Sequence, residues 1–114
     1  MNRRYKIIML CGNSEFMKEF LIEQKKLTRA GNIVIGTASH DRTYENLSIS
    51  EEILLDDLIK RQIEIADEIL VVNKHDEING NTENNIRYAI NCGKPIRYME
   101  KHYERNKQAL LCPL

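Results

Sequence analysis

One stretch of this chain constrains its fold more than any other, the segment from Asp67 to Tyr98. It opens with an apolar run, Ile69 to Val72, which is short and β-branched enough to predict a buried parallel strand. A polar loop follows from Asn73 to Asn81. Thr82 and Glu83 then suit the start of a helix, because Thr caps helices well and an acidic side chain favours the positive end of the helix dipole.

The same segment continues through that helix into a second strand. Ile86, Ala89 and Ile90 form an apolar stripe at helical spacing. Gly93 is typical of the residue that ends a helix, and Pro95 to Met99 predicts the next strand. This order of elements places the polar loop at the carboxyl edge of a parallel sheet, where ligands of open α/β folds bind.

The rest of the chain predicts more strands and helices in alternation. Strands are expected at Lys6–Cys11 and Ile33–Ile35. Asn13 or Ser14 can cap a helix that ends at Gly31, and Ser50 can begin another that lasts to about Ala66. The apolar residues whose roughly helical spacing predicts these two helices are Phe16, Phe20, Leu21, Leu27, Leu54, Leu55, Leu58, Ile59 and Ile63.

This order predicts one α/β domain, residues 1–114, with a four- or five-stranded parallel sheet and helices on both of its faces. A polar, aperiodic segment from Thr37 to Leu47 is long enough to be a functional loop. The tail from Lys101 fits either a solvated helix or an extended arm.

The composition restricts the classes of partner. Lys and Arg together number 17, as do Asp and Glu, and this balance argues against broad binding to nucleic acids or to membranes. No segment is long enough to span a membrane, and the apolar run Ile7 to Cys11 is too short for a signal peptide, so we expect a cytoplasmic protein. Cys11 and Cys92 stand in apolar contexts and are expected to be buried, reduced thiols.

Two polar loops are expected to meet at the carboxyl edge of the sheet, Gly12 to Glu15 and Asn73 to Asn85. Each leads into a helix N-terminus, where free backbone N–H groups favour an anion or a sugar oxygen. Capping alone would explain the first loop, and the turn chemistry of Asn would explain the second. The candidate ligand-binding residues are Gly12, Asn13, Ser14, Asn79, Asn81, Thr82 and Asn85.

Other residue combinations carry weaker signals. His40 and Asp41 could form an acid/base pair, but adjacent side chains rarely face one another and no nucleophile is spaced to complete a triad. No His, Cys, Asp or Glu cluster has metal-ligand spacing, and His75 and His102 are expected to be solvated. We predict neither a metal nor a cofactor.

The span from Ile7 to Glu100 resembles the small proteins related to nucleoside 2-deoxyribosyltransferases. The segments that carry this resemblance are Leu10–Phe16, Leu55–Arg61, Ile65–Ile69, Asn81–Ala89 and Gly93–Pro95. The resemblance implies a flavodoxin-like, Rossmann-like three-layer form of the predicted sheet. It also implies a homodimer or a larger homo-oligomer, for which the tail with Tyr103, Leu110 and Leu111 is a possible contact.

In that family a Glu on the helix after the third strand is the nucleophile that attacks the anomeric carbon. The chain has Asn85 at the matching position. A neutral amide cannot form the glycosyl ester of covalent catalysis, although it can hydrogen-bond sugar hydroxyls. Asp67 matches another acidic position of the family, and capping of a strand or a turn would explain it equally well.

Three functions remain open at this point. The first is a catalytically degenerate protein that binds or sequesters a ribosylated nucleotide or nucleoside. The second is an active N-glycosidase or deoxyribosyltransferase that acts on (deoxy)nucleosides or their monophosphates, with Glu15 or Asp67 as the carboxylate. The third is a structural or partner-binding domain in which the polar loop only forms turns.

Overall fold

The computed structural model describes residues 5–36 and 46–100, which form an α/β fold with a four-stranded, all-parallel sheet. The sheet order is β2-β1-β3-β4, and its strands are β1 (Ile7–Gly12), β2 (Ile33–Ile35), β3 (Glu68–Val72) and β4 (Ile96–Tyr98). The helices are α1 (Met17–Arg29), α2 (Ile49–Ile65) and α3 (Gly80–Asn91), with short 3₁₀ turns η1 (Ser14–Phe16) and η3 (Lys74–Asp76). The predicted fold class is confirmed. Of the four or five strands expected, the described residues form four.

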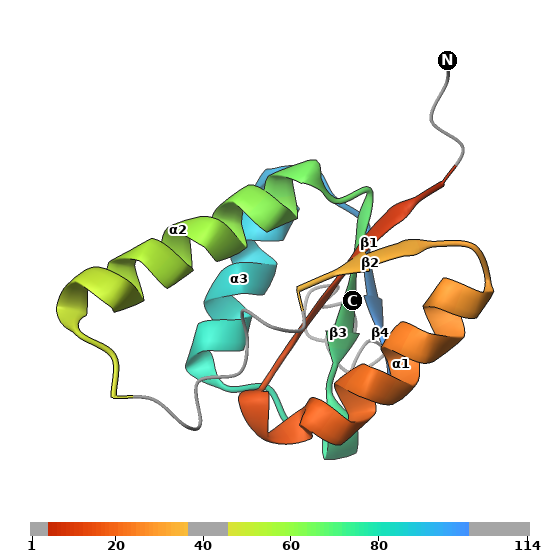
Figure 1. Cartoon of the computed structure of the whole chain (residues 1–114), viewed down its shortest axis with the longest axis horizontal. Coiled ribbons are helices and arrows are strands. Elements are labelled where there is room, and N and C mark those ends of the chain that lie inside the picture. Colours follow the sequence, from red (N-terminus) through yellow and green to blue (C-terminus); the bar gives the residue numbers. More distant parts are fainter. Residues whose placement is uncertain (1–4, 37–45, 101–114) are drawn as a thin grey trace, which may run out of the picture.

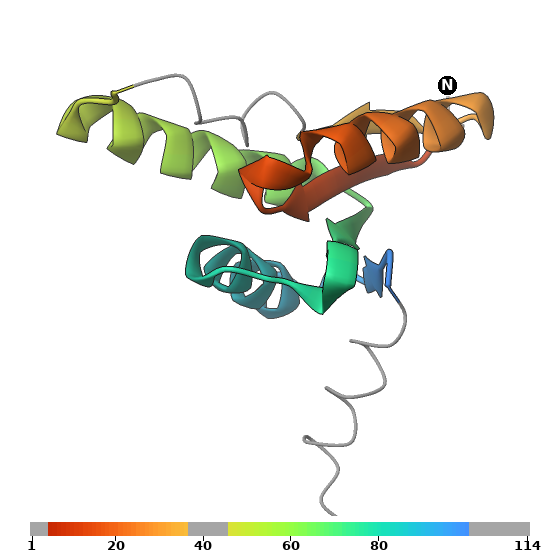
Figure 2. The same ribbon diagram turned by 90° about the horizontal axis from the view of Figure 1, so that it is seen from below.

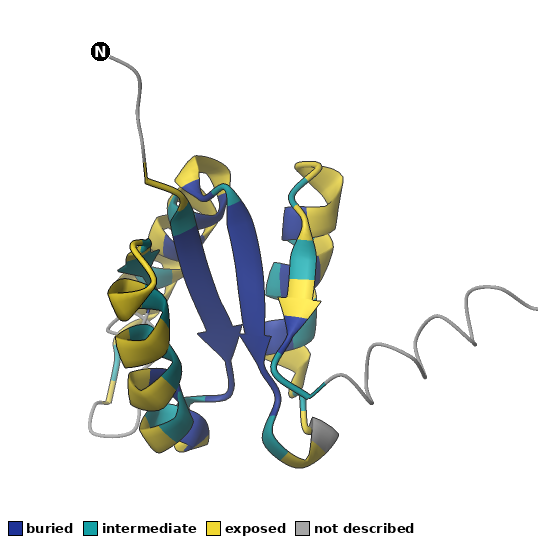
Figure 3. Cartoon of the chain, turned by 90° about the vertical axis from the view of Figure 1, so that its right-hand side faces the viewer, coloured by how far each residue is buried: buried dark blue, intermediate teal, exposed yellow. Residues whose placement is uncertain are grey.

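Helices cover both faces of the sheet and make a flavodoxin-like, three-layer arrangement. Helices α2 and α3 lie on one face and α1 lies on the other (Figures 1 and 2). Strands β1 and β3 form the buried centre (Figure 3), which explains why their sequences are continuous apolar runs instead of alternating, apart from Glu68 at the start of β3. Toward α1 the core contains Ile8, Leu10, Phe16, Phe20, Leu70 and Val72. Toward α2 and α3 it contains Met9, Cys11, Ile59, Ile63, Ala66, Ile69, Val71, Ile86, Ala89 and Tyr98.

The two later helices begin at residues other than those predicted. The N-cap of α2 is Ser48, not Ser50, because the Ser48 hydroxyl accepts from the Glu51 backbone while the Glu51 carboxylate accepts from the Ser48 backbone. The N-cap of α3 is Asn79, whose Oδ1 accepts from the Thr82 backbone N–H. Thr82 therefore lies inside the first turn of the helix, where it is buried.

Some residues that were expected in the core are exposed. Leu21, Leu54 and Leu58 are about half exposed. The face of each helix that packs on the sheet is narrower than the face that carries apolar residues, so these side chains lie outside it. Cys11 is buried as predicted, but Cys92 is exposed at the C-cap of α3, so that prediction was wrong.

The remaining predictions on the long loop and the tail fall outside the described residues. These are the positions 37–45 with His40 and Asp41, and the positions 101–114 with His102, Tyr103, Leu110, Leu111 and Cys112. Within the described part of the chain, no helix is both long and apolar enough to cross a membrane.

An ion-pair cluster ties three strands together at the amino edge of the sheet. The Glu68 side chain is 8% exposed, and its two oxygens accept from Lys6 Nζ at 3.0 Å and from Arg97 Nε at 2.7 Å. Burial by itself would raise the pKa of the Glu68 carboxyl, but the hydrogen bonds from the two cations outweigh it and leave the pKa below its ordinary value.

We expect Glu68→Gln to lower the free energy of unfolding by about 1–3 kcal/mol near pH 7, because the variant keeps the shape but loses two charge-assisted hydrogen bonds. The lowered native pKa means that Glu68 contributes stability above the unfolded pKa, about 4.3, and that this contribution is lost as the pH falls through the native value. Urea unfolding across this pH range should show the variant and the wild type converging in acid. Glu77→Gln, at an exposed position, is the control, and a pH-independent difference for Glu68→Gln would contradict the explanation.

Candidate functional site

The candidate site begins where β1 and β3 end side by side at the carboxyl edge of the sheet. Gly12 lies opposite Val72 in the parallel register. A Cβ atom on Gly12 would stand 2.5 Å from the Val72 carbonyl oxygen, so only glycine permits this approach of the two backbones. The two polar loops predicted from the sequence therefore leave the sheet next to each other.

Asn13 joins these two loops. Its side chain is buried, and its Oδ1 accepts from the Asn79 backbone N–H at 2.9 Å and from the Thr82 hydroxyl at 3.1 Å. Its Nδ2 donates to Glu15 Oε1 at 3.1 Å. Asn13 was predicted to cap the first helix or to bind a ligand, but it makes no cap hydrogen bond. In the structure its amide holds the start of α3 against the loop after β1.

A small polar pocket of about 50 Å³ lies above these contacts. Its lining residues are Gly12, Ser14, Ile59, Asn79, Asn81, Thr82 and Asn85. Six of the seven predicted ligand-binding residues thus line one pocket, and the seventh, Asn13, supports it. The pocket contains amides and hydroxyls that can both donate and accept hydrogen bonds, and none of its lining side chains is charged.

Asn85 connects this pocket to the core through Cys11. Burial raises the pKa of the Cys11 thiol to about 12, and a hydrogen bond with the Asn85 side chain opposes this only in part. Cys11 is therefore a protonated thiol at neutral pH, and it is not an activated nucleophile.

A second hollow of about 180 Å³ adjoins the first and is lined by Asp56, Lys60, Asn81, Asn84 and Asn85. Asn81 and Asn85 belong to both hollows. Ile59, Asp56 and Lys60 were not among the residues predicted for the site. The spacing of Asp56 and Lys60, four residues apart, would have placed them on one face of α2. It could not have shown that this face lies beside the start of α3.

Two other polar residues have structural partners away from the pocket. Asn73 is fully buried, and its amide donates to the Glu100 carbonyl oxygen at 3.2 Å and accepts from the Glu100 N–H at 2.8 Å. Asp67 lies at the amino end of β3, where its Oδ2 accepts from the Ile7 N–H at 2.7 Å. The structure thus brings Glu15 beside the site but leaves Asp67 at the opposite edge of the sheet.

No family model matches this chain, and no curated protein is significantly similar to it. The resemblance to the nucleoside 2-deoxyribosyltransferases therefore depends on the sequence motifs alone. Within the residues that the structure describes, no group of three or more His, Cys, Asp and Glu side chains could hold a metal ion. His75 is exposed, as predicted.

We expect Asn13→Ala to lower the free energy of unfolding by about 1–3 kcal/mol, because it leaves the buried Thr82 hydroxyl and the Asn79 N–H without their acceptor. Urea denaturation would measure the change. Asn91→Ala is the control, since Asn91 is exposed at the end of α3 and its loss should cost less than about 0.5 kcal/mol. Equal effects of the two substitutions would show that the link between the loops adds no stability.

Proposed function

We propose that this protein binds a nucleoside or nucleotide through its sugar at the carboxyl edge of the sheet, and that it is catalytically degenerate. The observation that carries the proposal is the pocket of uncharged amides and hydroxyls at the start of α3. Sugar hydroxyls donate and accept hydrogen bonds at once, and so do the Asn and Ser side chains that line this pocket. The resemblance to nucleoside 2-deoxyribosyltransferases supports the same choice of ligand.

The size of the site favours a small part of such a ligand inside the pocket. A space of about 50 Å³ accepts one polar group, whereas drug-sized ligands usually occupy about 300–1,000 Å³. A nucleoside would therefore insert one edge of its sugar and extend over the adjoining hollow of Asp56 and Lys60. Asn81 and Asn85 contact both spaces, so they are the residues best placed to orient the ligand.

The proposed lack of covalent glycosyl transfer follows from the neutral side chain of Asn85. Attack on an anomeric carbon needs a nucleophile such as a carboxylate, and an amide oxygen does not form a stable glycosyl ester. The side chains of the pocket itself offer no carboxylate in its place. In this proposal the protein retains or sequesters its ligand and leaves the glycosidic bond intact.

An N-glycosidase or deoxyribosyltransferase is the second candidate, because two carboxylates lie close to the pocket. Glu15 accepts a hydrogen bond from Asn13, and Asp56 lines the adjoining hollow. Either could activate a water molecule against the anomeric carbon. This candidate predicts release of free base by the wild type, with loss of that activity in Glu15→Gln or Asp56→Asn.

We expect Asn85→Ala to weaken the binding of the ligand at least about tenfold, because it removes one side-chain hydrogen bond that is worth about 1.4 kcal/mol. Calorimetry with nucleosides, nucleoside monophosphates and ADP-ribose-like compounds would identify the ligand and measure this change. Asn91→Ala, on an exposed turn of the same helix, should bind as the wild type does. No binding of any compound to the wild type at millimolar concentration would refute the proposal.

Asn85→Glu tests whether only the nucleophile is missing. We expect this variant to release free base from deoxynucleoside monophosphates or from nicotinamide dinucleotides, while the wild type releases none, because the new carboxylate would lie among sugar-binding amides. Chromatography of the reaction products would detect the base. Cleavage by the wild type at a similar rate would instead support the enzymatic alternative.

A further inference from the structure

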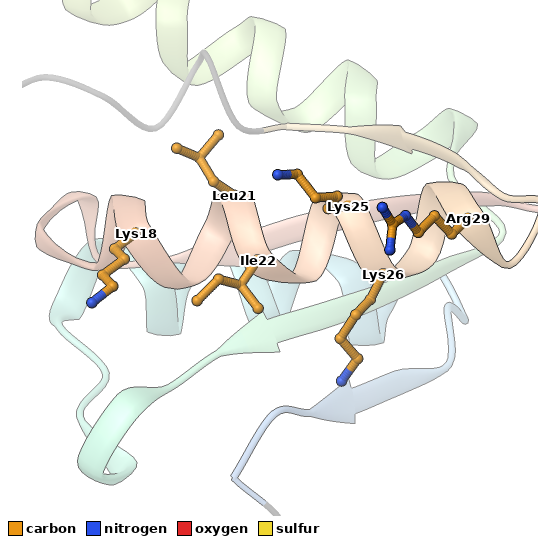
Figure 4. Close-up of a pocket in the computed structure, with 6 residues that line it drawn as sticks. All are labelled: Lys18, Leu21, Ile22, Lys25, Lys26 and Arg29. Carbon is orange, nitrogen blue, oxygen red and sulfur yellow. The ribbon is translucent and has the colours of Figure 1, made fainter.

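The outer face of α1 carries an apolar hollow surrounded by cations. The hollow measures about 440 Å³ and is lined by Lys18, Leu21, Ile22, Lys25, Lys26 and Arg29. Figure 4 shows the two apolar side chains between the basic ones along the helix. Leu21 is 54% exposed and Ile22 is 49% exposed, so this surface leaves apolar area in water that a partner would cover.

Among the residues that the structure describes, most of the cations on this face have no ion-pair partner. Lys26 pairs with Glu23 at 3.7 Å. Lys18, Lys25 and Arg29 take part in no ion pair within residues 5–36 and 46–100. A partner that covers the hollow should therefore be both apolar and acidic.

The first half of α2 has this complementary character. Residues 49–58 contain four acidic side chains and no basic one. Ile49 is 78% exposed, Ile53 is 65% exposed and Leu54 is 57% exposed, whereas Ile59 and Ile63 further along the helix are buried. Figure 1 shows that this half of α2 extends away from the sheet at the left of the view.

We propose that a second copy of this chain occupies the hollow, with the first half of its α2 packed on the outer face of α1. The two helices flank the edge strand β2 on opposite faces of the sheet, and both lie along the same side of the molecule (Figure 2). With a two-fold axis beside this edge of the molecule, α1 of each copy meets α2 of the other. One dimer then contains the same contact twice. The apolar residues meet in the centre and the opposite charges surround them, as in stable interfaces.

The C-terminal segment of the chain is a poorer occupant of the same hollow. Residues 101–114 contain Lys101, Arg105 and Lys107 against a single acidic residue, Glu104. Like charges would meet if this segment covered α1, which disfavours that contact.

Sedimentation equilibrium at physiological salt tests the proposal, using full-length protein up to millimolar concentration. The wild type should dimerise, and Lys25→Glu or Glu52→Lys should each weaken the dimer at least about tenfold, because each reversal places like charges together at both copies of the contact. An equimolar mixture of the two variants should restore dimerisation to within about threefold of the wild type, because opposite charges meet again in the mixed dimer.

A charge-matched control separates this contact from general attraction between proteins of opposite net charge. Glu77→Lys adds the same charge as Glu52→Lys, but at an exposed position in the loop before α3. It should dimerise like the wild type, and it should not rescue Lys25→Glu. Equal rescue by Glu77→Lys would overturn the proposal.

The apolar contribution is tested independently of charge. Leu21→Gln combined with Ile22→Gln should abolish the dimer while the circular dichroism spectrum stays that of the wild type, since both side chains are already half exposed. A wild type that remains a monomer at millimolar concentration, or a dimer that survives this double substitution, would overturn the proposal. The readout is a mass, so it does not depend on the ligand of the candidate site.

Discussion

The close pairing of β1 with β3 determines the position of everything else in the described structure. Five residues of β1 lie in register with the whole of β3, from Ile8 opposite Glu68 to Gly12 opposite Val72. The missing side chain of Gly12 lets the two backbones stay in contact up to the last residue. As a consequence, the two loops emerge at one point, and the single amide of Asn13 can reach both of them. A wider separation of these strands would leave the loops as two unconnected helix caps.

The sequence predicted the strands better than the helix starts, and the reason is physical. A strand buried on both faces is an almost continuous apolar run, and this pattern marked β1 and β3 to within one residue. The apolar run Ile33–Ile35 marked the partly exposed strand β2 at its observed bounds. A helix start depends on which of several nearby polar residues accepts a backbone hydrogen bond. Ser48 and Ser50, or Asn79 and Thr82, are equivalent in a linear sequence. The fold of the loop selects Asn79 as the N-cap of α3, because the Thr82 hydroxyl donates to Asn13 instead.

The candidate site was predictable in part for the same reason. The carboxyl edge of a parallel sheet brings together the loops that follow β1 and β3, so the sequence alone could place Ser14, Asn79 and Asn85 near one another. Asp56 and Lys60 could not be placed there, since they lie in the middle of a helix and reach the site only through the packing of α2 beside α3. Asp67 illustrates the converse case. The family motif suggested a carboxylate role for it, while its side chain accepts from the Ile7 N–H just before β3, as the alternative interpretation of a strand cap expected.

The same contacts that stabilise the site also limit what it can do. Asn13, Asn79 and Thr82 use side-chain atoms to hold the two loops together, so those atoms are not available to a ligand. In the proposed function, recognition would then depend on Ser14, Asn81 and Asn85, all of them neutral. Neutral amides discriminate by hydrogen-bond geometry and gain little from long-range attraction, which suits a sugar better than an isolated phosphate. Because Asn13 already joins the two loops in the absence of a ligand, the proposed binding would have a lower entropic cost, and a small set of contacts would be enough to hold the sugar.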